Sequence, residues 1–390
     1  MKSFARVFFW LILLVGPGWT QTAEDQLHEA IDQLAEFDYA VRMEAARALR
    51  RADPDAARPA LLHAVEHHQD SYVQFRSLVL IYGLDLPDAD KVFRAALGSS
   101  NDRVRASAYE YFETFPSPSV VSQLLAALDT ETSEFVRPYL VRALAANDDD
   151  SSVRERLVQD IHRGQGYFRG AVIEALGDHG ALYAVDSLIP LIAEDGPFRD
   201  DALLALAKIG DRRIIQSLRE MQRDSDVKLQ PIVSAAACLL DVGCDGQLSY
   251  IVDTLRYGIE PQNENNQELI RNASTALSAL ATDGQQGALN ALFELGMNAS
   301  ETAARAPIAL ALGKVALRNP AIVQNTLVDA ASEASMPEAE LLLLRDAFDM
   351  LDEDFAEERF YVLMRKGYWD GFGSTKARAV ASAAIRVLEF

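Results

Sequence analysis

A nine-residue pattern recurs seven times between residues 41 and 235. Its copies read VRMEAARAL, VQFRSLVLI, VRASAYEYF, VRPYLVRAL, FRGAVIEAL, FRDDALLAL and VKLQPIVSA, and they begin at Val41, Val73, Val104, Val136, Phe168, Phe198 and Val227. Successive copies therefore start 29 to 32 residues apart. A period in this range is typical of small helical units that stack in a row. The pattern restricts the fold strongly, whereas it says little about what the protein binds.

Each copy has the spacing of an amphipathic helix, and a second such helix precedes it. In the first copy the apolar residues Val41, Ala45 and Leu49 lie on one face of a helix. Amphipathic stretches such as residues 57–68 and 120–129 precede later copies. Helices of about twelve residues are marginally stable alone, so each pair must bury its apolar face against its neighbours. The sequence thus predicts an all-α fold made of stacked helix pairs.

The consensus of the second helices is Val–Arg–x–x–Ala, as in Val41–Ala45 and Val104–Ala108, and two copies continue into ALGDHG (175–180) and KIGDRR (208–213). In these features the chain resembles the HEAT repeat, and most closely the short variety named after the phycobilisome lyases. The resemblance is good over residues 36–243 and continues as degenerate repeats over residues 244–390. It implies an α-α superhelix, or solenoid, of about eleven helix pairs. Such a solenoid would form one domain over residues 24–390, with the second helices on its concave side.

The N-terminus has the composition of a secretory signal peptide. Lys2 and Arg6 precede an apolar run at residues 7–16, and small and polar residues follow up to Ala23. The run is too short to span a bilayer. We therefore expect residues 1–23 to be a signal peptide and the mature chain to be exported, either to a periplasm or out of the cell. An uncleaved membrane anchor is the alternative, and no later run predicts stable membrane insertion of the mature chain.

The chain is acidic, with 37 Lys and Arg against 58 Asp and Glu and a formal net charge of −21. Such a surface repels nucleic acid and anionic lipid, so we expect no nucleic-acid partner. A basic residue nevertheless occupies the second position in six copies of the pattern: Arg42, Arg105, Arg137, Arg169, Arg199 and Lys228. Because most of them have an acid close by, the resemblance implies a ladder of ion pairs and helix N-caps between repeats. A basic stripe that holds an anionic ligand is the alternative.

One catalytic motif is present. His63, Glu66 and His67 spell H-x-x-E-H, in which two histidines on one helix face hold zinc and the glutamate acts as general base. No third ligand is evident, and Asp32, one repeat earlier, is only a candidate. The motif belongs to a first helix, which is expected on the convex side. A zinc-dependent hydrolase with His63 and His67 as metal ligands is therefore the alternative function rather than the preferred one.

Other catalytic patterns are missing from the sequence, which has no G-x-S-x-G, phosphate-binding loop or G-x-G-x-x-G, and we predict no cofactor. The preferred hypothesis is a non-catalytic scaffold that binds a protein or peptide partner on its concave surface, because a long curved surface of helices suits an extended partner. A purely structural spacer is a further alternative. Since aromatic side chains most often anchor partners, we predict that Phe135, Tyr139 and Tyr167 form the binding site.

The only two cysteines, Cys238 and Cys244, are predicted to form a disulfide. The helix that contains Cys238 is expected to end at Gly243 in a left-handed conformation. Such a cap folds the next residue back toward the residue five or six positions earlier. Export favours an oxidised pair. Two buried, reduced thiols are the alternative.

Overall fold

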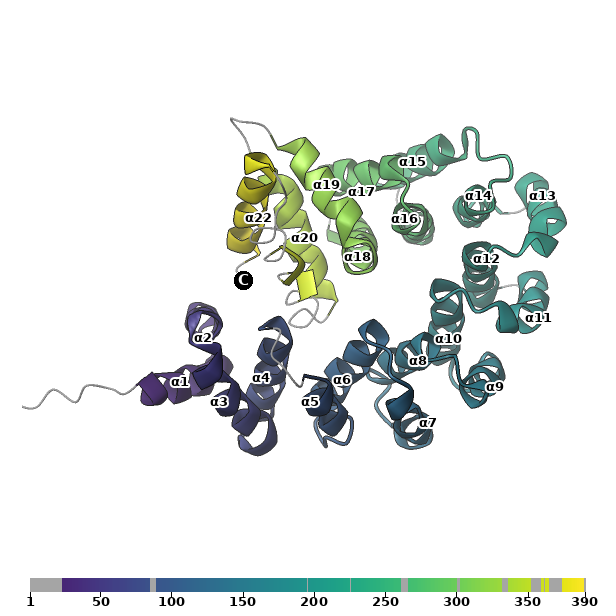
Figure 1. The fold of residues 1–390 in the computed structure, drawn as a ribbon. Helices are drawn as coiled ribbons and strands as arrows, with labels where there is room; N and C mark the ends of the chain where they lie inside the picture. The colour runs from purple at the N-terminus through teal and green to yellow at the C-terminus, as the bar shows by residue number, and fades with distance from the viewer. Residues whose placement is uncertain are drawn as a thin grey trace, which may run out of the picture.

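The computed structural model describes residues 23–84, 89–194, 196–224, 226–260, 266–299, 302–331, 336–351, 359–360, 362–364 and 374–388. Over these residues the regular secondary structure consists of α-helices and short 3-10 segments. The helices stack side by side along a path that bends back on itself, so that the C-terminal helices face the N-terminal ones (Figure 1). The predicted all-α solenoid is therefore confirmed. The expected signal peptide, apart from Ala23, lies outside the described residues.

The solenoid has two layers of helices. The outer layer, on the convex side, consists of α1 (Ala23–Asp32), α3 (Pro54–His67), α5 (Ala89–Ala96), α7 (Val121–Thr130), α9 (Ser151–Asp160), α11 (Val185–Leu188), α13 (Ile215–Asp224), α15 (Gln247–Gly258), α17 (Gln286–Asn298) and α19 (Pro320–Ala330). The inner layer, on the concave side, consists of α2 (Tyr39–Arg51), α4 (Ser71–Gly83), α6 (Asp102–Thr114), α8 (Arg137–Ala146), α10 (Gly166–Asp178), α12 (Pro197–Ile209), α14 (Gln230–Leu239), α16 (Gln267–Thr282), α18 (Thr302–Arg318) and α20 (Glu338–Met350). The 3-10 segments are η1 (Gln33–Ala35), η2 (Pro118–Val120), η3 (Leu182–Ala184), η4 (Ile189–Ala193) and η5 (Arg212–Ile214).

Each outer helix and the inner helix that follows it form one pair. The part of the chain that the structure describes holds ten consecutive pairs, from α1–α2 to α19–α20. A last helix, α22 (Thr375–Val387), packs against α19 and α20. The expected total of about eleven pairs stays a prediction.

Short polar side chains begin several inner helices. The Asp38 carboxylate accepts a hydrogen bond from the Ala40 N–H at 2.9 Å at the start of α2. At the start of α6, the Asn101 side chain takes the same role and accepts from the Arg103 N–H at 3.0 Å. Such caps satisfy amide groups that the start of a helix leaves unpaired.

The apolar core lies between the two layers. Leu140 of α8, Val172 of α10 and Leu203 of α12 are fully buried in it. Where α10 packs against α12, a Cβ added to Gly177 would lie 2.6 Å from the Cα of Ala205. A larger residue at position 177 would therefore push the two helices apart, which explains the glycine in ALGDHG.

The recurrent basic residues connect neighbouring repeats. Arg105 on α6 donates two hydrogen bonds to the Glu131 carboxylate of the next repeat, at 2.7 and 2.8 Å. The Arg137 guanidinium lies 4.3 Å from the centroid of the Phe168 ring, and the same contact recurs one repeat later. The ladder thus combines ion pairs with cation–π contacts. These side chains are engaged within the solenoid, which argues against a basic stripe that holds an anionic ligand.

Cys238 and Cys244 are joined by a disulfide, with 4.5 Å between their α-carbons. The end of α14, however, differs from the expectation. The left-handed residue that ends this helix is Asp241, with φ of 52°, and the N–H that follows it bonds to a carbonyl five residues earlier at 2.9 Å. Gly243 is also left-handed, with φ of 66°, but it lies beyond this cap. The expected position of the cap was wrong by two residues, although the chain still folds Cys244 back onto Cys238.

Contacts between distant repeats close the curve of the solenoid. Lys314 on α18 donates to Glu174 on α10 at 3.1 Å, and Arg359 donates to Glu110 on α6 at 2.5 Å. These partners lie 140 and 249 residues apart in the chain. Contacts between neighbouring repeats alone would not produce such pairs. The concave side is therefore a lumen whose walls come from both halves of the chain.

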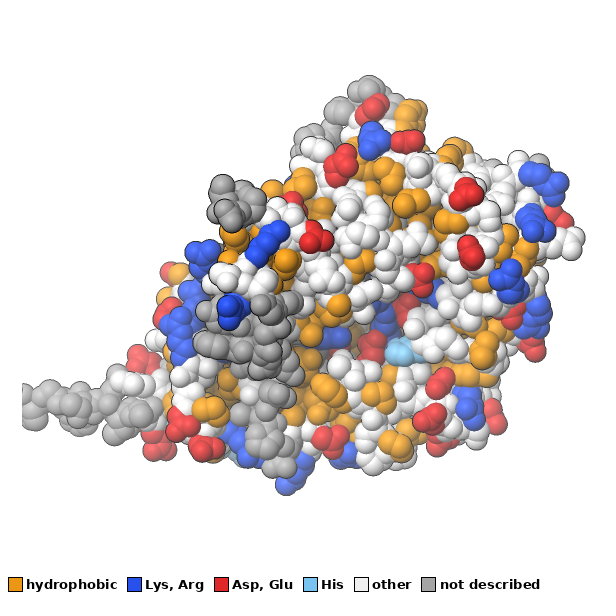
Figure 2. Space-filling model, turned by 45° about the horizontal axis from the view of Figure 1, so that its top comes forward, with side chains coloured by type: hydrophobic (Ala, Val, Ile, Leu, Met, Phe, Trp, Pro, Cys, Tyr) orange, Lys and Arg blue, Asp and Glu red, His pale blue; other side chains and the backbone are white. Residues whose placement is uncertain are grey.

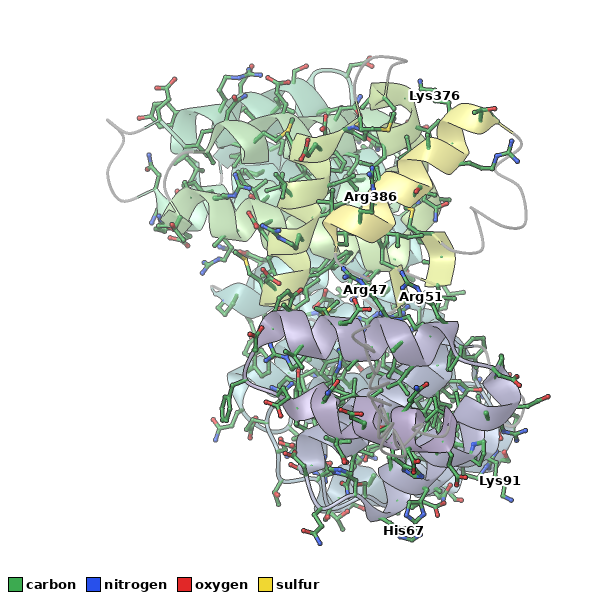
Figure 3. All side chains as sticks on the ribbon, turned by 90° about the vertical axis from the view of Figure 1, so that its left-hand side faces the viewer. Arg47, Arg51, His67, Lys91, Lys376 and Arg386 are labelled. Atoms are coloured by element: carbon green, nitrogen blue, oxygen red, sulfur yellow. A yellow bond between two sulfur atoms is a disulfide. The ribbon has the colours of Figure 1, made fainter. Side chains whose placement is uncertain are left out.

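The N-terminal and C-terminal helices of the solenoid face each other. Arg47 and Arg51 lie on the side of α2 that faces the C-terminal helices, and Arg386 lies on α22 among those helices (Figure 3).

Among the described residues, no single helix is long and apolar enough to cross a membrane. In the described part of the chain, one bent pair, α18 with α19, reaches the length and composition of a span, and its two helices meet at an angle of 111°. Both belong to the stacked pairs, and Leu312 and Val315 of α18 are fully buried in the core.

Candidate binding site on the concave side

The lumen contains a cavity of about 410 Å³ between the two halves of the solenoid. We name it the Phe135 cavity. Its walls come from α6 and α8 on one side and from α18 on the other, so it exists only because the solenoid bends back on itself. Figure 2 shows a hollow on this face, with acidic, basic and histidine side chains gathered in it.

Aromatic residues form one wall of the Phe135 cavity. The rings of Phe135 and Tyr139 contact each other, with 5.7 Å between their centroids. Phe135 keeps 39% of its surface exposed, whereas Tyr139 is half-buried. Rings held in this way lose little conformational entropy when a partner binds. The structure places both residues on the concave wall, and their binding of a partner stays a prediction.

Tyr167, the third predicted binding residue, lies elsewhere. It stands at the beginning of α10, is 69% exposed, and does not line the Phe135 cavity. The structure therefore brings together two of the three predicted aromatic residues. Tyr167 remains an exposed residue one repeat further along.

Ion pairs line part of the Phe135 cavity and continue into the adjoining part of the lumen. Arg142 on α8 donates to Glu113 at 2.6 Å and to Asp178 at 3.0 Å. Lys208 on α12 donates to Asp178 at 2.7 Å, and Arg318 reaches the same carboxylate from the opposite half of the chain. We name the whole set the lumen ion-pair network, and its members are Glu113, Arg142, Glu174, Asp178, Lys208, Lys314 and Arg318.

The network remains charged at neutral pH. Burial raises the pKa of Asp178, but Arg318, Lys208 and Arg142 outweigh this effect and hold the pKa well below its usual range. Burial likewise raises the pKa of Glu174, and the attraction of Lys314 and Arg318 lowers it to about 2. Groups with such pKa values act as fixed charges rather than as proton donors or acceptors near neutral pH. The network therefore supports the shape of the lumen rather than acid–base chemistry.

A second cavity, of about 540 Å³, adjoins the first and shares Lys314 and Arg318 with it. We name it the Asp201 cavity. It lies between α12, α16 and α18, and apolar residues such as Leu204, Leu310 and Met350 line much of it. Within the described part of the chain, Asp201 has no hydrogen bond and no ion pair. Partial burial, together with Glu174 and other nearby acids, raises the pKa of Asp201 to about 7.

Two repeat families match parts of this helical array. HEAT repeats match residues 25–110, and the PBS lyase HEAT-like repeat matches residues 198–224. The chain contains HEAT repeats. The first match covers the outer and inner helices from α1 into α6, and the second covers most of α12 and all of α13. A search of the curated proteins finds no match to the chain. HEAT repeats generally form non-catalytic scaffolds, many of which bind other proteins.

The H-x-x-E-H residues of this HEAT-repeat chain lie on α3 in the outer layer, and His67 is on the side away from the C-terminal helices (Figure 3). The rings of His63 and His67 contact each other, with 4.8 Å between centroids, and Glu66 approaches His67 to 3.5 Å. The candidate third ligand, Asp32, pairs instead with His68 at 3.1 Å. Among the residues that the structure describes, no group of three or more His, Cys, Asp or Glu side chains is placed to hold a metal ion. Nothing in this arrangement favours the hydrolase alternative.

The lumen ion-pair network and Asp201 were not predicted from the sequence. One signal for part of the network was present, because the seventh position of the repeated pattern is charged in four copies: Arg47, Glu110, Arg142 and Glu174. In the structure, the last three of these residues line the lumen cavities. A charge at a position that an amphipathic helix turns toward its partners indicates a functional or pairing role. The pattern does not show, however, which repeat lies opposite.

Proposed function

We propose that this HEAT-repeat chain is an exported, non-catalytic scaffold that binds a peptide, or an extended segment of a protein, in the Phe135 cavity and on the concave wall around it. The HEAT repeats support the scaffold part of the proposal. The observation that carries the binding site is the exposed ring of Phe135 packed against Tyr139 at a cavity of about 410 Å³. Partly exposed aromatic side chains in a concave site are typical anchors for a partner.

The size of the cavity bears on what it binds. Pockets for small ligands measure about 300–1,000 Å³, and the Phe135 cavity falls near the lower end of that range. It therefore suits one or two side chains of an extended segment rather than a folded element.

The charge of the wall bears on how the partner is held. The cations Arg142, Lys314, Arg318 and Arg359 that line the Phe135 cavity are already paired with carboxylates. Arg103, which also lines it, lies 5.5 Å from the centroid of the Phe75 ring. The side chains of this wall that are best placed to contact a partner are therefore the aromatic rings of Phe135 and Tyr139. We infer that the partner inserts an apolar side chain against Phe135 and Tyr139.

The last part of the proposal is that the protein is exported. Export is inferred from the basic flank and the apolar run at the N-terminus. The disulfide between Cys238 and Cys244 agrees with export, because disulfides persist in oxidising compartments. N-terminal sequencing of the protein from separated cell fractions tests this part. An exported chain that begins between Trp19 and Glu24 supports it, and a chain that retains Met1 in the cytoplasmic fraction contradicts it.

The binding part is tested by affinity capture from the exported fraction. The variant Phe135→Ala/Tyr139→Ala should recover much less partner than the unchanged protein, while its circular dichroism stays helical. Leu182→Ala is the matched control, because Leu182 is 71% exposed on η3 near the outer layer, away from the Phe135 cavity. Equal recovery by the double variant and the unchanged protein would count against the Phe135 cavity.

A further inference from the structure

The lumen pairs its carboxylates with cations, and Asp201 is an exception. Asp178 and Glu174 belong to the lumen ion-pair network, and Glu110 is paired with Arg359. Asp201 lies half-buried on α12, beside the same network, and forms neither an ion pair nor a hydrogen bond with the residues that the structure describes. The Asp201 carboxylate is therefore available to a charged group of a ligand.

The charges around Asp201 favour a cation. Beyond partial burial, the largest influences on the pKa of Asp201 are the acids Glu174 and Asp200, which raise it. Lys314 and Lys208 lower it less, and both lysines already form ion pairs with Glu174 and Asp178. A positive group placed beside Asp201 would therefore have Glu174 and Asp200 as further negative neighbours.

The surroundings of Asp201 suit an alkyl chain. A Cβ added to Gly170 of α10 would lie 3.1 Å from a carboxylate oxygen of Asp201, so a glycine leaves this carboxylate uncrowded. The cavity next to it is lined by apolar residues of α12 and α18, including Leu204, Pro307 and Leu310. Its volume, about 540 Å³, is within the range of pockets that hold small ligands. An aliphatic amine matches this cavity, because its alkyl chain can contact the apolar wall while its ammonium group lies beside the Asp201 carboxylate.

We propose that the Asp201 cavity is a binding site for an aliphatic ammonium group, with Asp201 as its counter-ion and the apolar wall of α12 and α18 in contact with its alkyl chain. The group comes either from a lysine side chain on a bound segment or from a free alkylamine, and both carry the same chemistry. This proposal depends only on the Asp201 cavity and is independent of the proposed binding of a partner in the Phe135 cavity.

Other charges face the same space. Arg271 of α16 lines the cavity and is exposed, and Lys208, Lys314 and Arg318 also border it. An alkyl carboxylate is therefore the competing occupant. Comparing ligands of equal length and opposite charge distinguishes the two.

The test titrates the full mature chain with n-hexylamine, n-hexanol and n-hexanoate at pH 8, by calorimetry or by chemical-shift changes. We expect saturable binding of hexylammonium, at least about tenfold tighter than that of the other two, which corresponds to about 1.4 kcal/mol. Asp201→Asn should weaken hexylammonium at least tenfold. Asp186→Asn, a change at an exposed carboxylate paired with Arg213 at the surface, should leave it unchanged.

Four outcomes overturn the proposal. Equal affinity for hexanol and hexylammonium would mean that the cavity recognises only the alkyl chain. Tighter binding of hexanoate would assign the cavity to an anion, held by Arg271. No binding of any of the three probes, or unchanged hexylammonium affinity in a folded Asp201→Asn variant, would also contradict it.

A second pair of probes identifies the source of the ammonium group. One is a capped Leu-Lys-Leu peptide, and the other is the same peptide with its lysine acetylated. Competition between the lysine peptide and hexylammonium, with no effect of the acetylated peptide, supports a lysine side chain. Binding of hexylammonium without binding of the lysine peptide supports a free amine. Equal competition by the two peptides would show that the ammonium charge is not recognised, which contradicts the proposal.

Discussion

Lys314 on α18 donates a hydrogen bond to Glu174 on α10 over 3.1 Å and across 140 residues of sequence. Next to it, Arg318 pairs with Asp178 at the end of α10. HEAT-like solenoids are held mainly by contacts between neighbouring repeats, so their curvature is free to vary. These two ion pairs join repeats that are far apart and fix the width of the lumen. Because both cavities lie between the joined halves, the proposed binding sites depend on this closure.

Removing Arg318 should open the lumen and destabilise the fold. Arg318→Gln leaves Asp178, which is only 8% exposed, without one of its cations. Breaking a buried pair costs roughly 3–5 kcal/mol, and we expect a loss of about 3 kcal/mol in the free energy of unfolding, because Arg142 and Lys208 still contact Asp178. Urea unfolding measures this loss, and small-angle scattering should show a larger radius of gyration.

The control for this experiment is Arg256→Gln on α15. Arg256 forms ion pairs with Asp253 and Glu294 at the surface, and exposed pairs contribute less than about 1 kcal/mol. Equal effects of the two substitutions, with no change in the radius, would contradict a special role for Arg318.

Acid should weaken the closed state. Lys314 and Arg318 lower the pKa of Glu174 to about 2, against an ordinary value of 4.5, and Asp178 is shifted in the same direction. A carboxyl group whose pKa is lowered by folding stabilises the fold above its unfolded pKa, and this contribution disappears as the pH falls through the folded value. The urea midpoint should therefore fall steadily between about pH 4.5 and pH 2. A midpoint that stays constant over this range would show that the network contributes nothing.

Asp201 should have the opposite effect on stability. Partial burial and the nearby acids raise its pKa to about 7, so the folded chain binds a proton there more tightly than the unfolded chain. Its contribution to stability is complete below the unfolded pKa and is lost as the pH rises through about 7. Asp201→Asn should therefore be more stable than the unchanged protein at pH 8, by on the order of 1 kcal/mol or more, and much closer to it at pH 4. Thermal unfolding at the two pH values measures this difference. If Asp201→Asn is less stable than the unchanged protein at pH 8, the raised pKa of Asp201 is refuted.

The disulfide should be present in the mature protein and should have a local effect. It closes a short loop, since Cys238 and Cys244 are six residues apart. The chain-entropy estimate for such a loop is about 2 kcal/mol, which we expect Cys238→Ser/Cys244→Ser to lose without loss of helical content. Intact-mass analysis after alkylation of the unreduced protein checks the bridge directly. Addition of two alkyl groups would refute it.

Local features of this fold were predictable from the sequence, whereas the closed lumen was not. The spacing of residues such as Val41, Ala45 and Leu49 determines helix pairs, because an apolar face must be buried wherever the chain goes. Helix geometry likewise turns Tyr139 toward the concave side, where it lines the Phe135 cavity. The cap at Asp241 was misplaced because glycine is only the commonest left-handed residue, and an aspartate adopts that conformation here.

The lumen ion-pair network depends on global curvature instead. That curvature results from small rotations added over many repeats, and no single repeat encodes it. The sequence therefore does not show that Lys314 lies opposite Glu174, or that Asp201 is left without a partner. The candidate binding wall was partly predictable from the sequence, and the lumen ion-pair network and the second cavity were not.

The most direct test of the proposed function places a photo-reactive benzoylphenylalanine at position 135 of the full-length chain and irradiates it in its native fraction. Position 182, which is exposed on η3 directly before the outer helix α11, is the control. The account predicts one discrete crosslinked partner from position 135 and none from position 182. It also predicts that a synthetic peptide of the crosslinked segment binds the unchanged protein but not Phe135→Ala/Tyr139→Ala. Crosslinks of the same kind at both positions, or none at position 135, would contradict a binding site on the concave side.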